Sequence, residues 1–115
     1  MVASRYIPRR GDIVWLNFDP IRGHEQGGKR PALVVSGANY NAKTGLALIC
    51  PITSRVKGYE FEVALSDTGD MRGVVLSDHV RNLDWKARRG TLAARAPEAI
   101  TSRVAEFISI LAQGA

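Results

Sequence analysis

The sequence of 115 residues contains only one cysteine and two histidines. A single cysteine cannot form a disulfide within the chain, and so few dispersed thiol and imidazole groups do not match the ligand spacing of a zinc site. We therefore expect neither a disulfide framework nor a bound metal.

Long apolar segments are also absent. Uninterrupted apolar runs such as residues 46–50 are far shorter than the roughly 20 residues that a bilayer span needs. Residues 1–12 contain three arginines and a proline and lack the apolar core of a secretory signal. The sequence therefore predicts a cytoplasmic protein without a membrane-spanning segment.

What is present is typical of a small folded protein with a positive charge. Hydrophobic residues make up 45% of the chain and charged residues 23%, and the length suits one domain over residues 1–115. The formal net charge is +5. A positive protein favours anionic partners such as nucleic acids, because contacts with phosphates release counterions. Many small basic proteins have no such partner, so charge alone does not decide.

The pattern of apolar residues predicts a mostly β chain. Residues 19–30 form a long glycine-rich loop without hydrophobic periodicity, and loops of this length are often functional. Asparagines and glycines at 37–45 predict a turn. The predicted strands, bounded by turn residues, cover 13–18, 32–36, 46–53, 59–65, 73–76 and 80–85.

Near the C-terminus the apolar residues change to helical spacing, at i, i+4, i+7, i+8 and i+11 from Ile100. Pro97 and Glu98 suit the first turn of this helix, and Gly114 suits its end. We therefore expect a small, strongly bent antiparallel sheet, or SH3-like barrel, that is partly covered by one C-terminal helix.

A candidate phosphate site follows from the predicted strand pairing. If the second and third strands pair in antiparallel register, Arg30 lies opposite Ile52 or Thr53. This register brings a guanidinium, a hydroxyl and the glycine-rich loop with His24 and Glu25 to one end of the sheet. A guanidinium suits phosphate because it donates two hydrogen bonds in one plane and keeps its charge.

These groups suit the cleavage of RNA, which carries its own nucleophile in the 2′-hydroxyl. Arg30 would stabilise the charged transition state, Thr53 would hydrogen-bond a phosphate oxygen, and Glu25 would orient groups or accept a proton. Each residue also has a simpler interpretation, as a solvated arginine at a strand edge, an ordinary strand threonine and a surface glutamate.

Other candidate groups are less specific. His24 and His79 suggest an acid–base pair, but no spacing brings them together, and we discount that mechanism. Cys50 lies in an apolar strand and is expected to be a buried filler. The basic residues between Arg81 and Arg95 either follow a nucleic-acid backbone or form a solvated positive rim.

Several segments together form a more specific pattern than any one strand or loop. They are residues 11–15 (GDIVW), 18–20 (FDP), 23–32 (GHEQGGKRPA), 40–45 (YNAKTG), 51–54 (PITS), 57–59 (KGY) and 61–63 (FEV). Over almost its whole length the chain resembles the MazF (PemK-like) family of ribonuclease toxins.

The resemblance implies a metal-independent cleavage of single-stranded RNA, without any cofactor, that leaves 2′,3′-cyclic phosphate and 5′-hydroxyl ends. It implies that Arg30 and Thr53 form the catalytic core and that Glu25 lies in the active-site loop. It further implies a homodimer with RNA in a groove along the subunit junction, and a cognate MazE-like antitoxin whose acidic C-terminal tail occupies that groove.

The RNA contacts that we expect involve both loop and strand residues. Compared with the closest family pattern, His24 replaces a small polar residue and His79 replaces a common glutamine. Because contacts with base edges set sequence preference, these changes leave the exact cleavage motif open, with an ACA-containing site as the family-level expectation. The candidate RNA-binding residues are His24, Gln26, Lys29, Asn41, Lys57, His79, Arg81 and Arg88.

Two other functions remain open from the sequence. A gyrase-poisoning toxin of the CcdB type resembles this family in fold but binds a protein and cleaves nothing. A non-catalytic RNA-binding barrel would retain RNA without shortening it. The expected pairing of Arg30 with Thr53 favours the nuclease.

Overall fold

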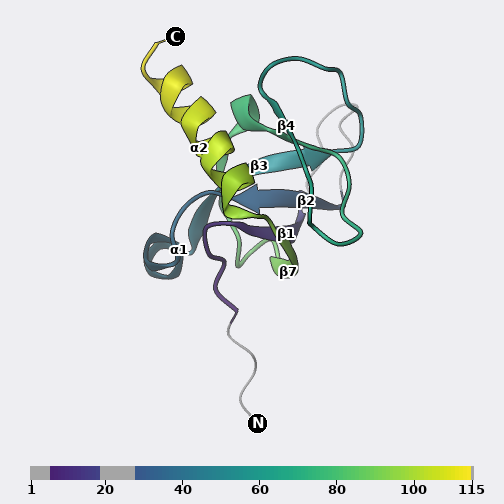
Figure 1. Cartoon of the computed structure of the whole chain (residues 1–115). Coiled ribbons are helices and arrows are strands. Elements are labelled where there is room, and N and C mark those ends of the chain that lie inside the picture. Colours follow the sequence, from purple (N-terminus) through teal and green to yellow (C-terminus); the bar gives the residue numbers. More distant parts are fainter. Residues whose placement is uncertain (1–5, 19–27, 115) are drawn as a thin grey trace.

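The computed structural model describes residues 6–18 and 28–114, which form one bent antiparallel sheet with a long C-terminal helix beside it (Figure 1). The elements are β1 (Asp12–Asn17), β2 (Lys29–Val34), α1 (Ala38–Thr44), β3 (Leu46–Thr53), β4 (Glu62–Ala64), β5 (Val74–Leu76), the 3-10 turn η1 (Ser77–His79), β6 (Arg81–Asp84), β7 (Thr91–Arg95) and α2 (Glu98–Ala112). The predicted fold, mostly β with a C-terminal helix, is confirmed. No helix in these described ranges is long and apolar enough to span a membrane.

Strand β3 is the centre of the sheet. It pairs antiparallel with β2, with β5 and with β6. The strand order is β4-β5-β3-β2-β1-β7, and β6 pairs with β3 beside this path. The C-terminal end of β3 therefore lies where β2 and β5 meet it from either side, and this end carries Thr53.

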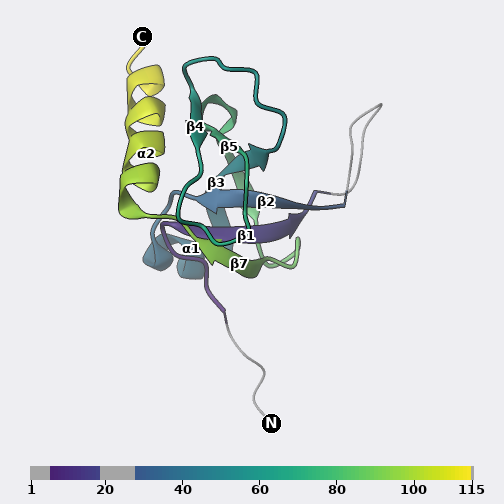
Figure 2. The same ribbon diagram turned by 45° about the vertical axis from the view of Figure 1, so that its right-hand side comes forward.

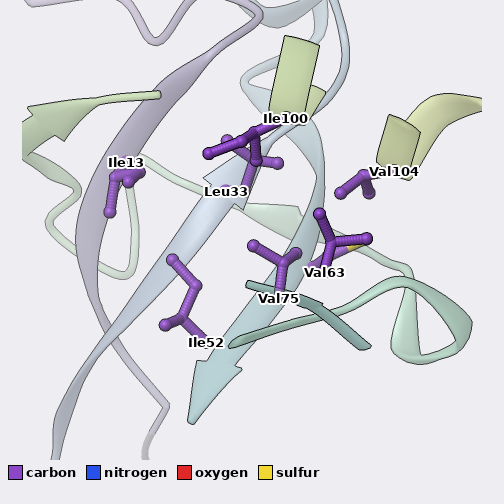
Figure 3. Packing of buried hydrophobic residues seen from close by; sticks show 8 residues of the cluster. Ile13, Leu33, Ile52, Val63, Val75, Ile100 and Val104 are labelled. Carbon is purple, nitrogen blue, oxygen red and sulfur yellow. The ribbon is translucent and has the colours of Figure 1, made fainter. Parts of the chain in front are cut away.

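Two apolar clusters cover the two faces of the sheet. One cluster packs under α2, where Ile100 and Val104 meet strand residues such as Ile13, Leu33 and Val75 (Figure 3). The other face is covered by a second cluster: Val14, Leu16, Ala32, Val34, Ala47, Ile49, Leu83 and Trp85. Because neighbouring residues of a strand point to opposite faces, strands buried on both faces have continuous apolar runs.

The turn expected at residues 37–45 is wrong, because this segment contains helix α1. Gly37 precedes the helix in an extended conformation, and Gly45 ends it with a φ of 72°, which favours glycine. Inside the helix, Asn41 is fully buried and its side chain bonds to the neighbouring backbone. Asn41 is therefore a buried polar anchor rather than part of a turn.

Two further strand predictions need correction. The strand expected at 59–65 is reduced to β4, because Glu62 folds the preceding residues into a turn by accepting bonds from the backbone N–H groups of Lys57 and Gly58. Strand β7 was not expected. Its basic and alanine-containing sequence lacks the β-branched pattern of the other strands, and its place is set by pairing with β1.

Candidate active site

The structure brings Arg30 and Thr53 together. Ala32 on β2 pairs with Pro51 on β3, and each step back along β2 matches one step forward along β3, so Arg30 reaches the level of Thr53. Both residues line one open pocket with a volume of about 490 Å³. The predicted juxtaposition is confirmed, whereas the catalytic roles of the two side chains remain predictions.

Thr53 is held in place by a close approach of two backbones. Gly73 has a φ of +121°, and a Cβ atom added to it would lie 2.4 Å from the carbonyl oxygen of Thr53. The hydroxyl of Thr53 accepts a hydrogen bond of 3.1 Å from the backbone N–H of Arg55. Because this bond uses a lone pair, the hydroxyl proton stays available for donation to a ligand oxygen.

Two arginines that the sequence analysis missed line the same pocket. Arg55 follows Thr53 by two residues, and Arg72 directly precedes Gly73. The side chain of Arg72 donates a 2.9 Å hydrogen bond to the carbonyl of Gly69. Among the described residues, the lining of this pocket includes three guanidinium groups and no carboxylate, so it suits an anion. The only sequence feature that could have assigned either arginine to this pocket was the proximity of Arg55 to Thr53.

A smaller pocket of about 210 Å³ adjoins this one and shares Thr53 and Arg55 with it. Two of the predicted RNA-binding residues, Lys57 and His79, line it. The imidazole Nε2 of His79 lies 3.8 Å from an oxygen of Asp78, a residue that lies at the sequence position next to it. Lys57 and His79 therefore lie on the surface that continues from the arginine pocket.

Three other predicted RNA-binding residues lie outside both pockets. Lys29 is exposed and pairs across the strands with Asn17. Arg88 donates a 3.1 Å hydrogen bond to the carbonyl of Asn17. The guanidinium of Arg81 lies 6.0 Å from the ring centre of Phe18. All three lie near the end of β1, where residues 19–27 begin. His24, Glu25 and Gln26 fall outside the described residues.

Asn41 contradicts the expectation that it contacts RNA. Its side chain is fully buried and donates hydrogen bonds to the carbonyls of Pro8, at 2.8 Å, and Ser36, at 3.2 Å. Its side-chain oxygen accepts a 2.6 Å bond from the hydroxyl of Ser36, and its carbonyl accepts the indole N–H of Trp85. Asn41 therefore joins the N-terminal segment, α1 and the second core, and its role is structural.

Cys50 is buried, as expected for a filler of the core. Burial, together with the nearby charge of Asp78, raises the pKa of Cys50 to about 12. A thiol that keeps its proton at neutral pH is a poor nucleophile. This agrees with the expectation that the cysteine takes no part in chemistry.

Comparison with known proteins shows to which family the chain belongs. The family model described as a PemK-like, MazF-like toxin of type II toxin–antitoxin systems matches residues 9–111. The endoribonuclease toxin MazF of Escherichia coli strain K12 is 44% identical over 107 residues, which cover 90% of this chain and 96% of that protein. The endoribonuclease PemK of Escherichia coli is 40% identical over 117 residues, covering 96% of this chain and 86% of that protein.

Solved structures agree. A MazE–MazF crystal structure (Form-II) from Deinococcus radiodurans matches with a TM-score of 0.88 at 50% identity, covering 96% of this chain and 100% of that chain. A MazF crystal structure from the same organism matches with a TM-score of 0.86 at 51% identity, covering 95% and 99%. The chain therefore belongs to the PemK-like, MazF-like toxin family of type II toxin–antitoxin systems, in which the named relatives compared above are endoribonucleases.

Proposed function

We propose that the protein is an endoribonuclease toxin that cleaves single-stranded RNA at a short sequence motif without a metal ion. The observation that carries the proposal is the shared pocket of Arg30 and Thr53, in a chain whose relatives are named endoribonucleases. The arginines of this pocket supply the positive charge that a metal ion supplies in other nucleases.

In the proposed reaction, the 2′-oxygen of the ribose attacks the adjacent phosphorus and the bond from phosphorus to the 5′-oxygen breaks. The products are a 2′,3′-cyclic phosphate and a 5′-hydroxyl, whose oxygen takes up a proton from water or from the group that accepted the 2′-hydroxyl proton. Arg30 stabilises the negative charge that grows on the phosphate oxygens, and Thr53 donates its hydroxyl proton to one of them. Glu25, in the loop that the family resemblance assigns to the active site, is proposed to orient groups or to accept the proton of the 2′-hydroxyl.

RNA recognition is proposed to extend from the arginine pocket in two directions. Lys57 and His79 lie beside Thr53, on the smaller pocket. The other contacts follow the end of β1 and the loop after it, and the motif is proposed to contain ACA. These residues are His24, Gln26, Lys29, Arg81 and Arg88.

The proposed partners are a second copy of the chain and a MazE-like antitoxin with an acidic C-terminal tail. One of the similar solved structures is a MazE–MazF complex. Carboxylates bind guanidinium groups in the same bidentate geometry as phosphates. An acidic tail would therefore compete with RNA for the pocket that Arg30, Arg55 and Arg72 line.

The test is cleavage of a long RNA in the presence of EDTA. We expect the unmodified protein to cut, and Arg30→Ala to lower the rate constant by about 10²- to 10³-fold, the usual loss for one group that stabilises an oxyanion. Thr53→Val, which nearly preserves shape, should lower kcat more than it raises KM. Sequencing the new 5′-hydroxyl ends then gives the motif.

Arg103→Ala is the matched control, because Arg103 is exposed on α2 and its ion pair with Glu106 is a surface pair. It should cut at the unmodified rate. Full cleavage by a folded Arg30→Ala protein would reject the site. Loss of cleavage in EDTA would reject metal independence. If the unmodified protein and all variants left the RNA intact, a protein target such as gyrase would be favoured instead.

A further inference from the structure

A second large pocket lies on the other side of Arg72 and belongs to none of the predicted sites. Its volume is about 570 Å³. One wall is the segment between β4 and β5, which descends across β2 and β1 in Figure 2, and the other wall consists of β1 and β7. We name it the Trp15 pocket; it is lined by Trp15, residues 67–72 and residues 93–95.

An irregular strand makes room for this pocket. Along β1 and β7, Ile13 pairs with Ala94 but Val14 pairs with Leu92, so Ala93 is an extra residue in β7. Such a bulge places two successive side chains near one face of the sheet, and both Ala93 and Ala94 line the pocket. Because both side chains are single methyl groups, space remains between the sheet and the segment that covers it.

Trp15 gives the pocket an aromatic surface. Its side chain is 36% exposed, although it lies on a strand whose neighbours Val14 and Leu16 are fully buried. An indole that is open to solvent at a pocket wall is a stacking surface for an unpaired nucleobase. Trp85, the other tryptophan of the chain, is 7% exposed and donates its N–H to Asn41, so it offers no such surface.

The Trp15 pocket is continuous with the arginine pocket at two points. Arg72 lines both pockets. Trp15 is the cross-strand partner of Pro31, which lines the arginine pocket beside Arg30. Residues that pair directly across two strands lie on the same face of the sheet. Arg30 is one residue further along β2 and faces the other side of the sheet, so an RNA strand held by its phosphate at Arg30 and Thr53 reaches the indole by way of Arg72.

The polar groups around the Trp15 pocket indicate which bases fit. Asp67 and Asp70 supply carboxylate oxygens, which accept hydrogen bonds but repel phosphate. Arg95 is held by Asp12, whose buried carboxylate lies 3.2 Å from its Nε. Exocyclic amino groups of adenine, cytosine and guanine are donors suited to a carboxylate, and uracil has no amino group.

We propose that the Trp15 pocket is a nucleobase subsite that binds one unpaired, amino-bearing base of the RNA substrate, next to the linkage bound by Arg30 and Thr53. The inference rests on the proposed function in assuming that RNA occupies the arginine pocket. The base stacks on Trp15, its amino group donates to Asp67 or Asp70, and its phosphate meets Arg72.

The experiment measures binding separately from cleavage. The probes are fluorescent hexamers of adenosine, cytidine or uridine with 2′-O-methyl ribose, which lack the attacking hydroxyl and cannot be cut. We expect the adenosine and cytidine hexamers to quench the Trp15 fluorescence and to bind more tightly than the uridine hexamer. Trp15→Ala should weaken their binding by about tenfold, a common loss for one stacked base, and Trp15→Phe should retain most of it.

Asp70→Asn should reduce the preference for amino-bearing bases while leaving uridine binding nearly unchanged. Leu92→Ala is the control, because Leu92 is an exposed apolar residue of β7 that lies outside the lining of the pocket. Thermal unfolding checks each fold, and Trp15→Phe keeps the test decisive if Trp15→Ala does not fold.

Unchanged affinity in a folded Trp15→Ala protein would overturn the subsite, as would equal affinity of the unmodified protein for all three hexamers. The subsite would also be overturned, in favour of a protein-binding pocket, if Trp15→Ala weakened the binding of an acidic peptide but not the binding of the hexamers. Cleavage of a long RNA is measured in parallel. If the unmodified protein cuts that RNA, failure of the subsite leaves the proposed function intact; if it neither cuts RNA nor binds any hexamer, the proposed function has failed.

Discussion

At the scale of single residues, the position of Thr53 depends on Gly73, which has no side chain. Gly73 lets the start of β5 approach the end of β3 so closely that a methyl group would meet the Thr53 carbonyl. Its φ of +121° is also a conformation that other L-residues rarely adopt. Steric contact and backbone strain therefore both require glycine at this position.

Gly73→Ala should consequently lower stability by about 2 kcal/mol or more and displace Thr53, so that cleavage falls in the folded protein as well. Thermal unfolding and the rate of RNA cleavage check this. Gly58→Ala is an informative control, because Gly58 has a φ of +85° but no atom within 4 Å of an added Cβ. If Gly73→Ala behaved no worse than Gly58→Ala, the close approach would not be what positions the hydroxyl.

At the scale of elements, α1 shows how one buried amide joins parts of the chain that are distant in sequence. The side-chain amide of Asn41 donates to Pro8 ahead of β1 and to Ser36 ahead of α1, while its backbone carbonyl accepts the indole N–H of Trp85 beyond β6. Removal of a side chain with several buried partners leaves those partners without hydrogen bonds.

Asn41→Ala should therefore cost about 2–4 kcal/mol of unfolding free energy, measured by urea denaturation. Asn39→Ala, on the exposed side of the same helix, should change it by less than about 0.5 kcal/mol. RNA affinity of the folded Asn41→Ala protein should equal that of the unmodified protein. A selective loss of RNA affinity with normal stability would restore the residue to the RNA interface.

The pairing of neighbouring strands was predicted from the sequence, whereas contacts between distant segments were not. The β2–β3 register followed from two apolar runs that are consecutive in the sequence and pair as antiparallel neighbours, and this placed Arg30 beside Thr53. The sequence did not place Arg72 and Trp15 at one site, because they line the same pocket only when the segment between β4 and β5 crosses the sheet. Such contacts between distant segments leave no periodic signal in sequence.

At the scale of the whole molecule, part of the positive charge behind the net charge of +5 is concentrated on one surface. Four cationic side chains line the two joined pockets around Thr53: Arg30, Arg55, Lys57 and Arg72. Charges that gather on one surface attract a polyanion more strongly than the same charges spread evenly.

We expect the logarithm of the RNA dissociation constant to rise with the logarithm of salt concentration with a slope of about 3, since each neutralised phosphate of a single strand contributes about 0.7. Titration of a 2′-O-methyl RNA between low and moderate KCl measures it. Arg72→Ala should lower the slope by about 0.7, whereas Arg103→Ala should leave it unchanged. A slope near zero would show that these side chains do not contact the backbone.

The central place of β3 has a consequence for how such a protein is controlled. A strand bonded to β2, β5 and β6 opens only when those neighbours detach, so its amide protons should be among the slowest of the molecule to exchange with solvent. The hydroxyl at the end of β3 is thus ready for as long as the chain stays folded. We therefore do not expect local melting to switch off the proposed site, whereas a molecule that fills the place of the substrate would do so.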